Sequence, residues 1–214
     1  MTLRLNGSNS GFTEITAPAT AGDNTITLPA GNGSANQFLK NSGTAGTLEF
    51  AALAGSNMPT GSILQVVHVA KADLFSVAGS QGNFSTVFSA QITPSSSSNK
   101  ILVTWTCNLS CSSANFMMGI RILRDSTAVG IGDALDSRTR SGASNLIVAN
   151  TISNVQGAQS FLDSPSTTSQ VTYNLQVGGE SSVGTLFVNR NGHGGTSADH
   201  YMGASHLVLM EVAA

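Results

Sequence analysis

The chain has 214 residues, enough for one or two domains and one sizeable hydrophobic core. Charged residues make up 9% of it, against roughly a quarter in an ordinary soluble domain, while hydrophobic residues make up 40%. This balance excludes a disordered chain, because such chains combine low hydrophobicity with high charge. The net charge of −2 provides no basic field, so we expect neither a nucleic acid nor membrane insertion.

Serine, threonine, asparagine and glycine replace the missing charge, and a surface of hydroxyls and amides does not repel copies of itself. Two explanations fit this composition: an oligomeric or fibrous assembly with surfaces buried against neighbours, or a secreted carbohydrate-binding domain. The segment MTLRLNGSNSGF lacks the apolar region of a secretory signal. No run approaches the ~18 apolar residues of a membrane span. The sequence therefore favours the assembly.

Residues 1–54 carry short apolar bursts separated by turn-forming segments. The bursts are LRL, FTEI, TITL, QFL and TLEF. Such short strands bury too little apolar surface to offset the backbone entropy of a monomer. We expect either a segment that becomes ordered on assembly or a flexible linker. In the first case the interface residues are Phe12, Ile15, Ile26, Leu28, Phe38, Leu39, Leu48 and Phe50.

The next stretch, AALAGSNMPTG, has the composition of a domain boundary, because the residue before proline is pushed out of the helical region. We predict an N-terminal segment at 1–54, a linker at 55–61 and a larger domain at 62–214. In that domain we expect strands at 63–69, 84–92, 101–111, 116–124, 127–135, 146–155, 171–177, 185–190 and 206–212, with a polar turn at 161–169. About eight or nine strands with no helical period indicate an antiparallel β-sandwich, which we expect to be a jelly roll.

The segment KILVTWTCNLSC is the predicted central strand of this sandwich. Its odd-numbered residues, including Trp105, are apolar, while its even-numbered residues are mostly polar. That alternation is typical of a half-buried strand. Cys107 and Cys111 then lie about 13 Å apart at about 3.3 Å per residue, too far for a disulfide, so we expect two buried free thiols.

Candidate catalytic residues are absent from the sequence patterns. There is no G-x-S-x-G pentapeptide, P-loop or dinucleotide-binding fingerprint, and we expect neither an enzyme nor a cofactor. The turn acids, among them Asp125 and Asp163, are interpreted as residues that bond to their own backbone. His193, Asp199 and His200 share one long loop at 191–205, but their spacing gives little support to a metal site.

One cluster of charges stands out in a chain this poor in charge: Asp133, Asp136, Arg138 and Arg140. Three interpretations remain open for it. The four residues form ion pairs between subunits, they hydrogen-bond a sugar, or they belong to a solvated turn.

Several stretches resemble phage virion appendage proteins, the tail fibres, head fibres and knob-like proteins of cyanophage-type phages. At the N-terminus they lie in FTEITAPATAGDNTITLPAGNGSANQFLKNSGTAGTLEFAAL (12–53). Further along they are SNKILVTWTCNLS (98–110), RILRDSTAVGIGDA (121–134), SFLDSPSTTSQVTYNLQV (160–177), TLFVNR (185–190) and LVLMEV (207–212).

The resemblance implies a structural protein of the virion, assembled in the host cytoplasm as a homotrimer. Its N-terminal segment would attach to another virion protein of the capsid or tail. Its C-terminal sandwich would form a knob for host adhesion or capsid decoration, with a host cell-surface glycan as a further candidate partner. These families share no sugar-site motif, so no binding residue is carried over.

Overall fold

The computed structural model describes residues 3–193, 198 and 200–214. By its internal contacts it divides into two compact units, the first ending at Asn57 and the second beginning at Met58. Its elements are β-strands apart from one 3-10 turn, Gly55–Asn57. Among the described residues, no helix is long and apolar enough to cross a membrane.

The N-terminal unit contains two short antiparallel hairpins. β1 (Leu3–Asn6) pairs with β2 (Phe12–Ile15), and β3 (Gln37–Asn41) pairs with β4 (Leu48–Ala52). The TITL burst forms only an isolated bridge between Thr27 and Thr47. The short elements agree with the turn-rich sequence, because glycine-rich breaks end each burst after a few residues.

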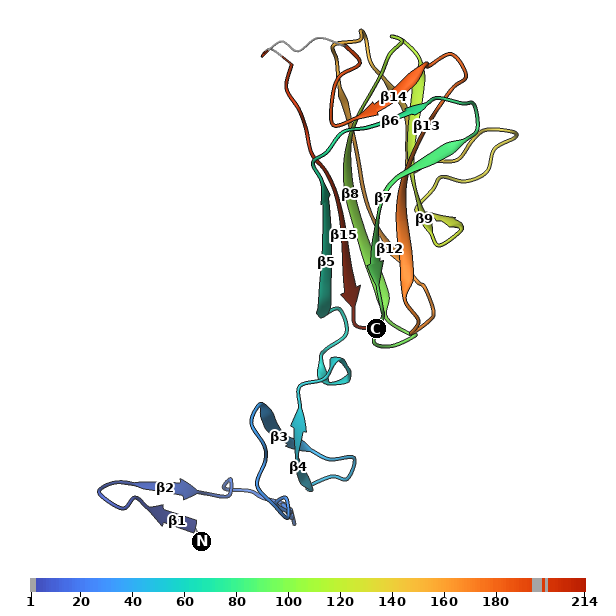
Figure 1. The fold of residues 1–214 in the computed structure, drawn as a ribbon. Helices are drawn as coiled ribbons and strands as arrows, with labels where there is room; N and C mark the ends of the chain where they lie inside the picture. Colours follow the sequence, from blue (N-terminus) through green and yellow to red (C-terminus); the bar gives the residue numbers. More distant parts are fainter. Residues whose placement is uncertain (1–2, 194–197, 199) are drawn as a thin grey trace. The chain divides into compact units, whose positions relative to one another are not determined.

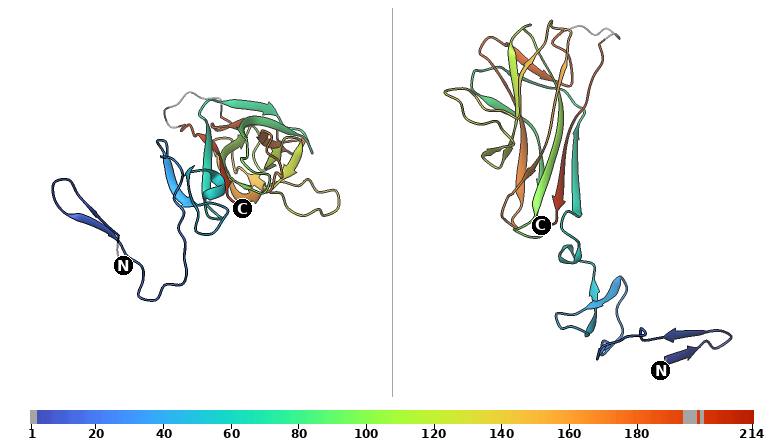
Figure 2. Two further views of the ribbon diagram at one scale, coloured as in Figure 1. Left: turned by 90° about the horizontal axis from the view of Figure 1, so that it is seen from below. Right: turned by 180° about the vertical axis from the view of Figure 1, so that it is seen from behind.

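The C-terminal unit is a sandwich of two stacked antiparallel sheets, as the alternating sequence predicts (Figures 1 and 2). The first sheet has the order β5-β15-β8-β14-β6, with β12 also paired to β8; the second has the order β10-β9-β13-β7, with β11 also paired to β9. The strands are β5 (Ile63–Lys71), β6 (Phe75–Ala78), β7 (Phe84–Ile92), β8 (Lys100–Cys111), β9 (Met117–Arg124), β10 (Thr127–Val129), β11 (Ala143–Ile147), β12 (Val155–Asp163), β13 (Val171–Gly179), β14 (Thr185–Val188) and β15 (Ser205–Val212).

β8 is the central strand of the first sheet, as predicted. It pairs with β15 and β14 on one edge and with β12 on the other. Its odd-numbered residues from Ile101 to Cys111 are buried and contribute to a core that both sheets share. Burying each large apolar side chain stabilises the fold by about 1.5–3 kcal/mol. Both cysteines on this face are free and buried, which confirms the prediction.

The prediction was wrong between residues 146 and 169. Instead of a strand at 146–155 and a turn at 161–169, β11 ends at Ile147 and β12 runs through Val155–Asp163. The sequence of β12 lacks a continuous apolar side, because its inward-facing residues include Gly157. A Cβ atom there would lie 2.5 Å from Ile120 Cδ1, so the core leaves no room for an apolar side chain.

Two further predictions in this region also need correction. Asp163 is not in a turn: it ends β12, is buried, and forms an ion pair of 2.7 Å with Arg124. The strand expected at 127–135 ends at Val129, because Gly130 adopts a φ of 61° that extended pairing does not tolerate. The residues that follow form a long loop between β10 and β11.

A buried carboxylate holds one end of the sandwich together. Glu211 is 1% exposed and accepts four hydrogen bonds. The donors are Gln65 Nε2 at 2.6 Å, the backbone N–H of Ser95 at 2.6 Å, Ser95 Oγ at 2.7 Å and Asn99 Nδ2 at 2.7 Å. A buried charge is stable only when it is bonded in this way. This cluster was not identified from the sequence, because its members Gln65, Ser95, Asn99 and Glu211 come from segments far apart in the chain.

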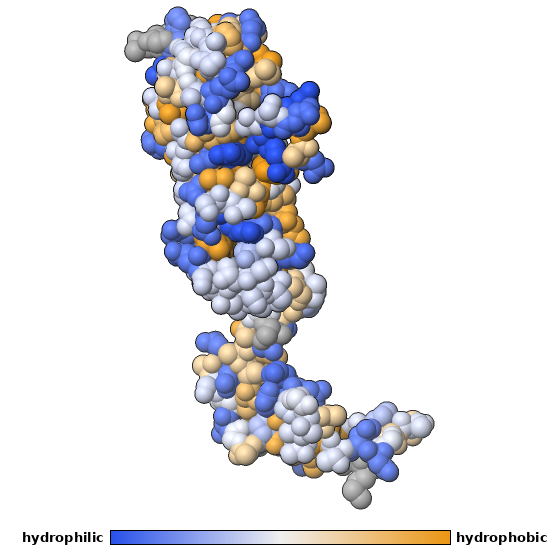
Figure 3. All heavy atoms as spheres, turned by 90° about the vertical axis from the view of Figure 1, so that its right-hand side faces the viewer, coloured by the Kyte–Doolittle hydropathy of each residue, from blue (hydrophilic) through white to orange (hydrophobic). Residues whose placement is uncertain are grey.

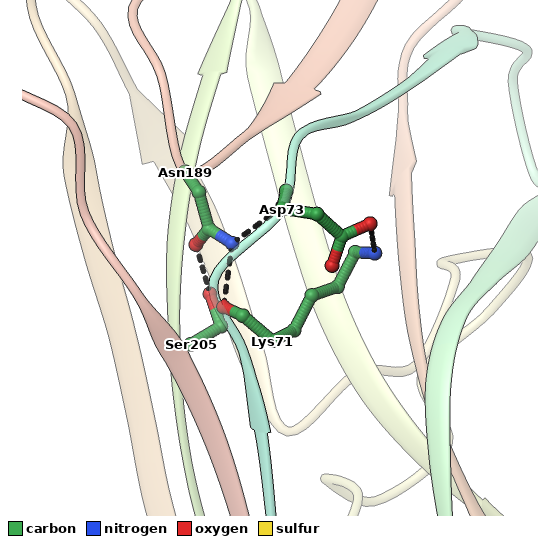
Figure 4. Close-up of polar contacts among 4 residues, drawn as sticks. All are labelled: Lys71, Asp73, Asn189 and Ser205. Carbon is green, nitrogen blue, oxygen red and sulfur yellow. Dashed lines mark hydrogen bonds and ion pairs between the residues drawn. The ribbon is translucent and has the colours of Figure 1, made fainter.

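A second polar cluster joins three segments that are far apart in the sequence (Figure 4). Asn189 Nδ2 donates to the carbonyl oxygens of Lys71 at 2.8 Å and Asp73 at 3.0 Å. Ser205 Oγ donates to Asn189 Oδ1 at 2.7 Å. Lys71 and Asp73 also form an ion pair of 2.7 Å, and this hydrogen bond lowers the pKa of Asp73. The cluster fixes the end of β5 beside the start of β15.

Candidate functional site

The N-terminal unit exposes apolar side chains without a core beneath them. Among its residues with described burial none is buried, and Ile26 and Leu28 are 68% and 70% exposed. Of the residues expected at an interface, only Leu48 is half-buried. The exposed ones are Phe12, Ile15, Ile26, Leu28, Phe38, Leu39 and Phe50. Figure 3 shows this apolar surface interspersed with polar side chains.

Isolated two-stranded hairpins are at best marginally stable in water, because they bury too little surface to offset their backbone entropy. The ion pairs Arg4–Glu14 and Lys40–Glu49 connect the strands of each hairpin, but both are exposed and contribute little. The apolar surface of this unit is therefore suited to docking against another protein surface.

The C-terminal unit contains a pocket of about 760 Å³ beside the loop between β10 and β11. This loop forms one wall, with Asp133, Leu135, Arg138 and Arg140 among its lining residues. The other walls come from the turn before β7, the start of β9 and the end of β13. The loop itself projects from the sandwich (Figure 2). The fold thus brings segments together that are up to a hundred residues apart in the chain.

Hydrogen bonds to the sandwich anchor both ends of the loop. Gln159 Nε2 donates to the carbonyl oxygen of Gly130 at 2.7 Å, and the N–H of Gly142 donates to the carbonyl oxygen of Ile120 at 2.9 Å. Within the loop, Arg140 Nε donates to the carbonyl oxygen of Gly132 at 2.6 Å. Because that bond uses one edge of the guanidinium, the other N–H groups of Arg140 remain for a bound molecule.

The floor of the pocket is held by contacts of Glu180 and Phe84. Glu180 Oε1 accepts the backbone N–H of Met117 at 2.6 Å, which joins the end of β13 to the start of β9. The guanidinium of Arg121 stacks 4.2 Å from the centre of the Phe84 ring, and burial lowers the pKa of Arg121. Such a cation–π contact fixes the orientation of the ring.

Three of the four charged residues singled out in the sequence line this pocket: Asp133, Arg138 and Arg140. Asp136 lies in the same loop at a φ of 50° but is not part of the lining. Within the described part of the chain, the ion pairs involve none of these four residues. Sequence reasoning missed the contributions of 81–84 and 178–180, which only the long-range topology brings to the site.

The lining of the pocket combines two arginines, two carboxylates, several hydroxyls and three side-chain amides. The amides belong to Gln81, Asn83 and Asn145, and the hydroxyls to Ser137, Thr139, Ser141 and Ser144. Groups of this kind form paired hydrogen bonds with vicinal hydroxyls and with carboxylates. The arrangement is suited to binding a polar, hydroxyl-rich molecule.

His193 and His200 are the described histidines of the loop at 191–205. The rings of His193 and His200 lie 5.0 Å apart, whereas Asp199 lies outside the described residues. Within the described ranges, no group of three or more His, Cys, Asp or Glu side chains could hold a metal ion.

The chain has structural neighbours but no matching family model. No protein-family model matches the chain, and no curated protein matches it. Among solved structures, infectious bursal disease virus of the Gt strain is similar over 98% of this chain and 46% of that chain, with 16% identity and a TM-score of 0.41. The VP2 subviral particle of infectious bursal disease virus is similar over 83% and 43%, again with 16% identity and a TM-score of 0.41.

The chain thus spans less than half the length of these structural neighbours. These neighbours are a virus and a subviral particle. At such TM-scores the likeness carries no argument about this chain, and its function has to be inferred from its own surfaces.

Proposed function

We propose that this chain is a non-enzymatic structural protein of a phage virion, a trimeric fibre or knob. Its N-terminal segment attaches to another virion protein of the capsid or tail. Its C-terminal sandwich is exposed for host-surface adsorption or capsid decoration. Tail fibre and head fibre are both compatible with this role.

One observation carries the proposal: the N-terminal unit has exposed apolar residues, and none of its residues with described burial is buried. A segment of this kind gains its stability from a partner, because ordering its backbone costs about 1–2 kcal/mol per residue. Attachment to a particle supplies such a partner at the moment of assembly. The linker role expected for 55–61 is part of this proposal.

The strand order of the C-terminal unit supports a jelly roll. If the eight strands β5, β7, β8, β9, β11, β12, β13 and β15 are numbered one to eight, the sheets have the orders 1-8-3-6 and 2-7-4-5. In these orders strands one and eight, two and seven, three and six, and four and five are neighbours. This pairing is the arrangement of the two Greek keys in a jelly roll. Jelly rolls recur in viral capsids and in lectins, so the order fits a virion component and a glycan-binding knob.

Deletion of residues 1–54 tests the attachment role. We expect the shortened protein to keep the far-ultraviolet circular dichroism spectrum of a folded sandwich. We also expect it to lose incorporation into particles, measured by immunolabelling of purified virions. A matched pair of full-length variants sharpens the test. Ile26→Ser with Leu28→Ser should reduce incorporation, whereas Thr20→Ser with Asn24→Ser should leave it unchanged. Normal loading of the deleted protein would rule out the attachment role.

The pocket beside the β10–β11 loop favours a second candidate function, carbohydrate binding. Its hydroxyls, amides and arginines match the chemistry of a sugar, and the two arginines, Arg138 and Arg140, also suit sugars that carry a carboxylate. Saturation-transfer NMR with neutral and uronic-acid oligosaccharides tests it. Arg138→Ala and Asn145→Ala should each abolish the signal of a bound oligosaccharide, while Arg4→Ala, which changes no lining residue of the pocket, should retain it.

A further inference from the structure

The two outer faces of the sandwich differ in chemistry, although both belong to antiparallel sheets. On the β7–β13–β9 sheet, the outward side chains include Leu123 and the exposed Met117, but most of them are polar and several form hydrogen bonds with one another. Ser89 Oγ donates to Asn174 Oδ1 at 2.6 Å, and Gln91 Nε2 donates to Thr172 Oγ1 at 3.2 Å. Arg121 Nε extends the pattern by donating to Gln176 Oε1 at 2.9 Å. This face is built to contact water.

The outward face of the other sheet has an apolar row across four strands. The strand registers align Leu162 of β12, Leu102 of β8, Met210 of β15 and Val66 of β5. At the two edges, Leu162 is 51% exposed and Val66 is 57% exposed. A row of large apolar side chains across a sheet is costly to leave in water, at roughly 25 cal/mol per Å².

The next two rows on the side of Ala70 carry no charge, whereas the row on the other side of the apolar row includes Lys100. Of the two uncharged rows, one consists of Ser160, Thr104, Val208 and His68, and the other of Ala158, Thr106, His206 and Ala70. We call these twelve residues in three rows the β5–β12 face. It contains no Asp, Glu, Lys or Arg. If a partner placed a charged group against this face, that charge would be buried without a counter-ion, which is costly. A second copy of the same uncharged face does not incur this cost.

The polar groups of the β5–β12 face are largely paired within the face. His68 Nε2 and His206 Nδ1 lie 3.1 Å apart and share a hydrogen bond, with their rings stacked. Thr104 Oγ1 and Ser160 Oγ also form a hydrogen bond. Covering these groups with an apolar surface therefore leaves few donors or acceptors unsatisfied, and this removes the main cost of burying them.

The size of the face suits association of two copies. Four strands about 4.8 Å apart and about six residues long present roughly 400 Å² in plan. Two such faces give a projected area of at least about 800 Å². Because side chains protrude from both sheets, the accessible area that they bury is larger and approaches the ~1,200 Å² at which specific interfaces begin. Two sheets can pack face to face at about 10 Å, as in any sandwich.

We propose that the β5–β12 face binds a second copy of this chain and forms the self-contact of the assembled protein. This inference rests on the proposed function and specifies which of the two sheets faces the neighbouring copy. The water-facing sheet and the loop pocket then remain accessible on the outside of the assembly.

Light scattering coupled to size-exclusion chromatography of the full chain tests the proposal. The wild type should have a mass of two or three subunits of 21.8 kDa. Val66→Lys and Leu162→Lys should each reduce the mass to that of one subunit, because two or three copies would bring like charges together in a buried contact. Gln91→Lys is the matched control: it adds the same charge to an exposed position on the edge strand of the water-facing sheet, and it should retain the wild-type mass.

A thermal unfolding curve for each variant establishes that a loss of mass is not a loss of fold. A single-subunit wild type, or Lys variants of Val66 and Leu162 that both stay associated, would overturn the proposal. Particle incorporation separates this result from the attachment role. If incorporation requires residues 1–54 while the Lys variants stay associated, the attachment role stands and the self-contact lies elsewhere. If the Lys variants dissociate while wild-type incorporation is absent, the self-contact stands and the attachment role fails.

Discussion

The hydroxyl of Tyr173 donates a hydrogen bond of 2.6 Å to Asp163 Oδ2 and so links the two sheets of the sandwich through its interior. Tyr173 belongs to β13 and Asp163 to β12, while Arg124 of β9 binds the same carboxylate at 2.7 Å. Burial and the neighbouring Asp163 raise the pKa of Tyr173 well above its ordinary value, which keeps its hydroxyl a donor. The polar triad joins three strands where the core is otherwise apolar.

Tyr173→Phe should lower the free energy of unfolding by about 2 kcal/mol, since a hydrogen bond to a charged group is worth about 1.5–3 kcal/mol. Urea denaturation measures the change as a lower midpoint with an unchanged slope. Tyr201→Phe is the matched control, because Tyr201 is 84% exposed and its substitution should be neutral. Equal midpoints for both variants would contradict a structural role of the Tyr173 hydroxyl.

The stability of the sandwich should depend on Glu211 at acidic pH. Burial alone would raise the pKa of Glu211, but hydrogen bonds from Asn99, Gln65 and Ser95 outweigh it and lower the pKa below the ordinary value. The unfolded chain then takes up the proton first, so the stabilisation is present above the ordinary pKa of a glutamate. It is lost as the pH falls through the lower folded value.

Unfolding free energies measured from pH 7 to pH 3 check this sign. In Glu211→Gln the stability should be lower by about 2 kcal/mol at pH 7, because the charge-assisted hydrogen bonds are weakened, and it should fall less steeply with acid. Glu49→Gln serves as the control, since Glu49 forms only an exposed ion pair with Lys40. A slope for Glu211→Gln as steep as in the wild type would exclude this role.

The thiols should resist modification as long as the protein is folded. Burial raises the pKa of Cys107 to about 11, and burial also raises the pKa of Cys111. Since the thiolate is the reactive form, a thiol reagent at pH 8 should modify neither residue in the native state and both in urea. Ser97→Cys, in an exposed turn, provides a third thiol that should react at once. Rapid native labelling of Cys107 would disagree with its position in the core.

Gly157→Ala should destabilise the sandwich by about 1–3 kcal/mol through overpacking. A Cβ atom at this position would lie 2.5 Å from Ile120 Cδ1 and 3.4 Å from Trp105 Cζ3. Thermal unfolding would report the loss as a lower midpoint temperature. Gln156→Ala, on the exposed side of the same strand, should change it little, and a similar effect of both substitutions would argue against the packing explanation.

The sequence was most informative where one face of a strand meets the core. In β8 every odd-numbered residue from Ile101 to Cys111 is apolar and buried, so the strand and its buried side could be predicted together. β12 was missed because the neighbouring strands fill the space beneath Gly157, and a glycine carries no hydrophobic signal. The role of Asp163 was missed for a related reason: its partners Arg124 and Tyr173 come from other strands.

The candidate sites were likewise predicted only where the signal lies within one segment of the sequence. The surplus of apolar bursts in 1–54 indicated an unsupported surface, since composition alone limits how much a short segment can bury. The charge cluster identified one wall of the loop pocket through Asp133, Arg138 and Arg140. Its other walls depend on how β7, β9 and β13 pair, and sequence patterns within single strands do not specify pairing between distant ones.

The position of β15 has a consequence for biosynthesis. This strand lies between β5 and β8, and both of those strands end more than ninety residues before β15 begins. While the ribosome is still translating residues 72–204, β5 has no neighbour and β8 has one edge incompletely covered. The sheet can close only after Ser205–Val212 has emerged, so premature stop codons should yield chains with open strand edges that aggregate instead of folding.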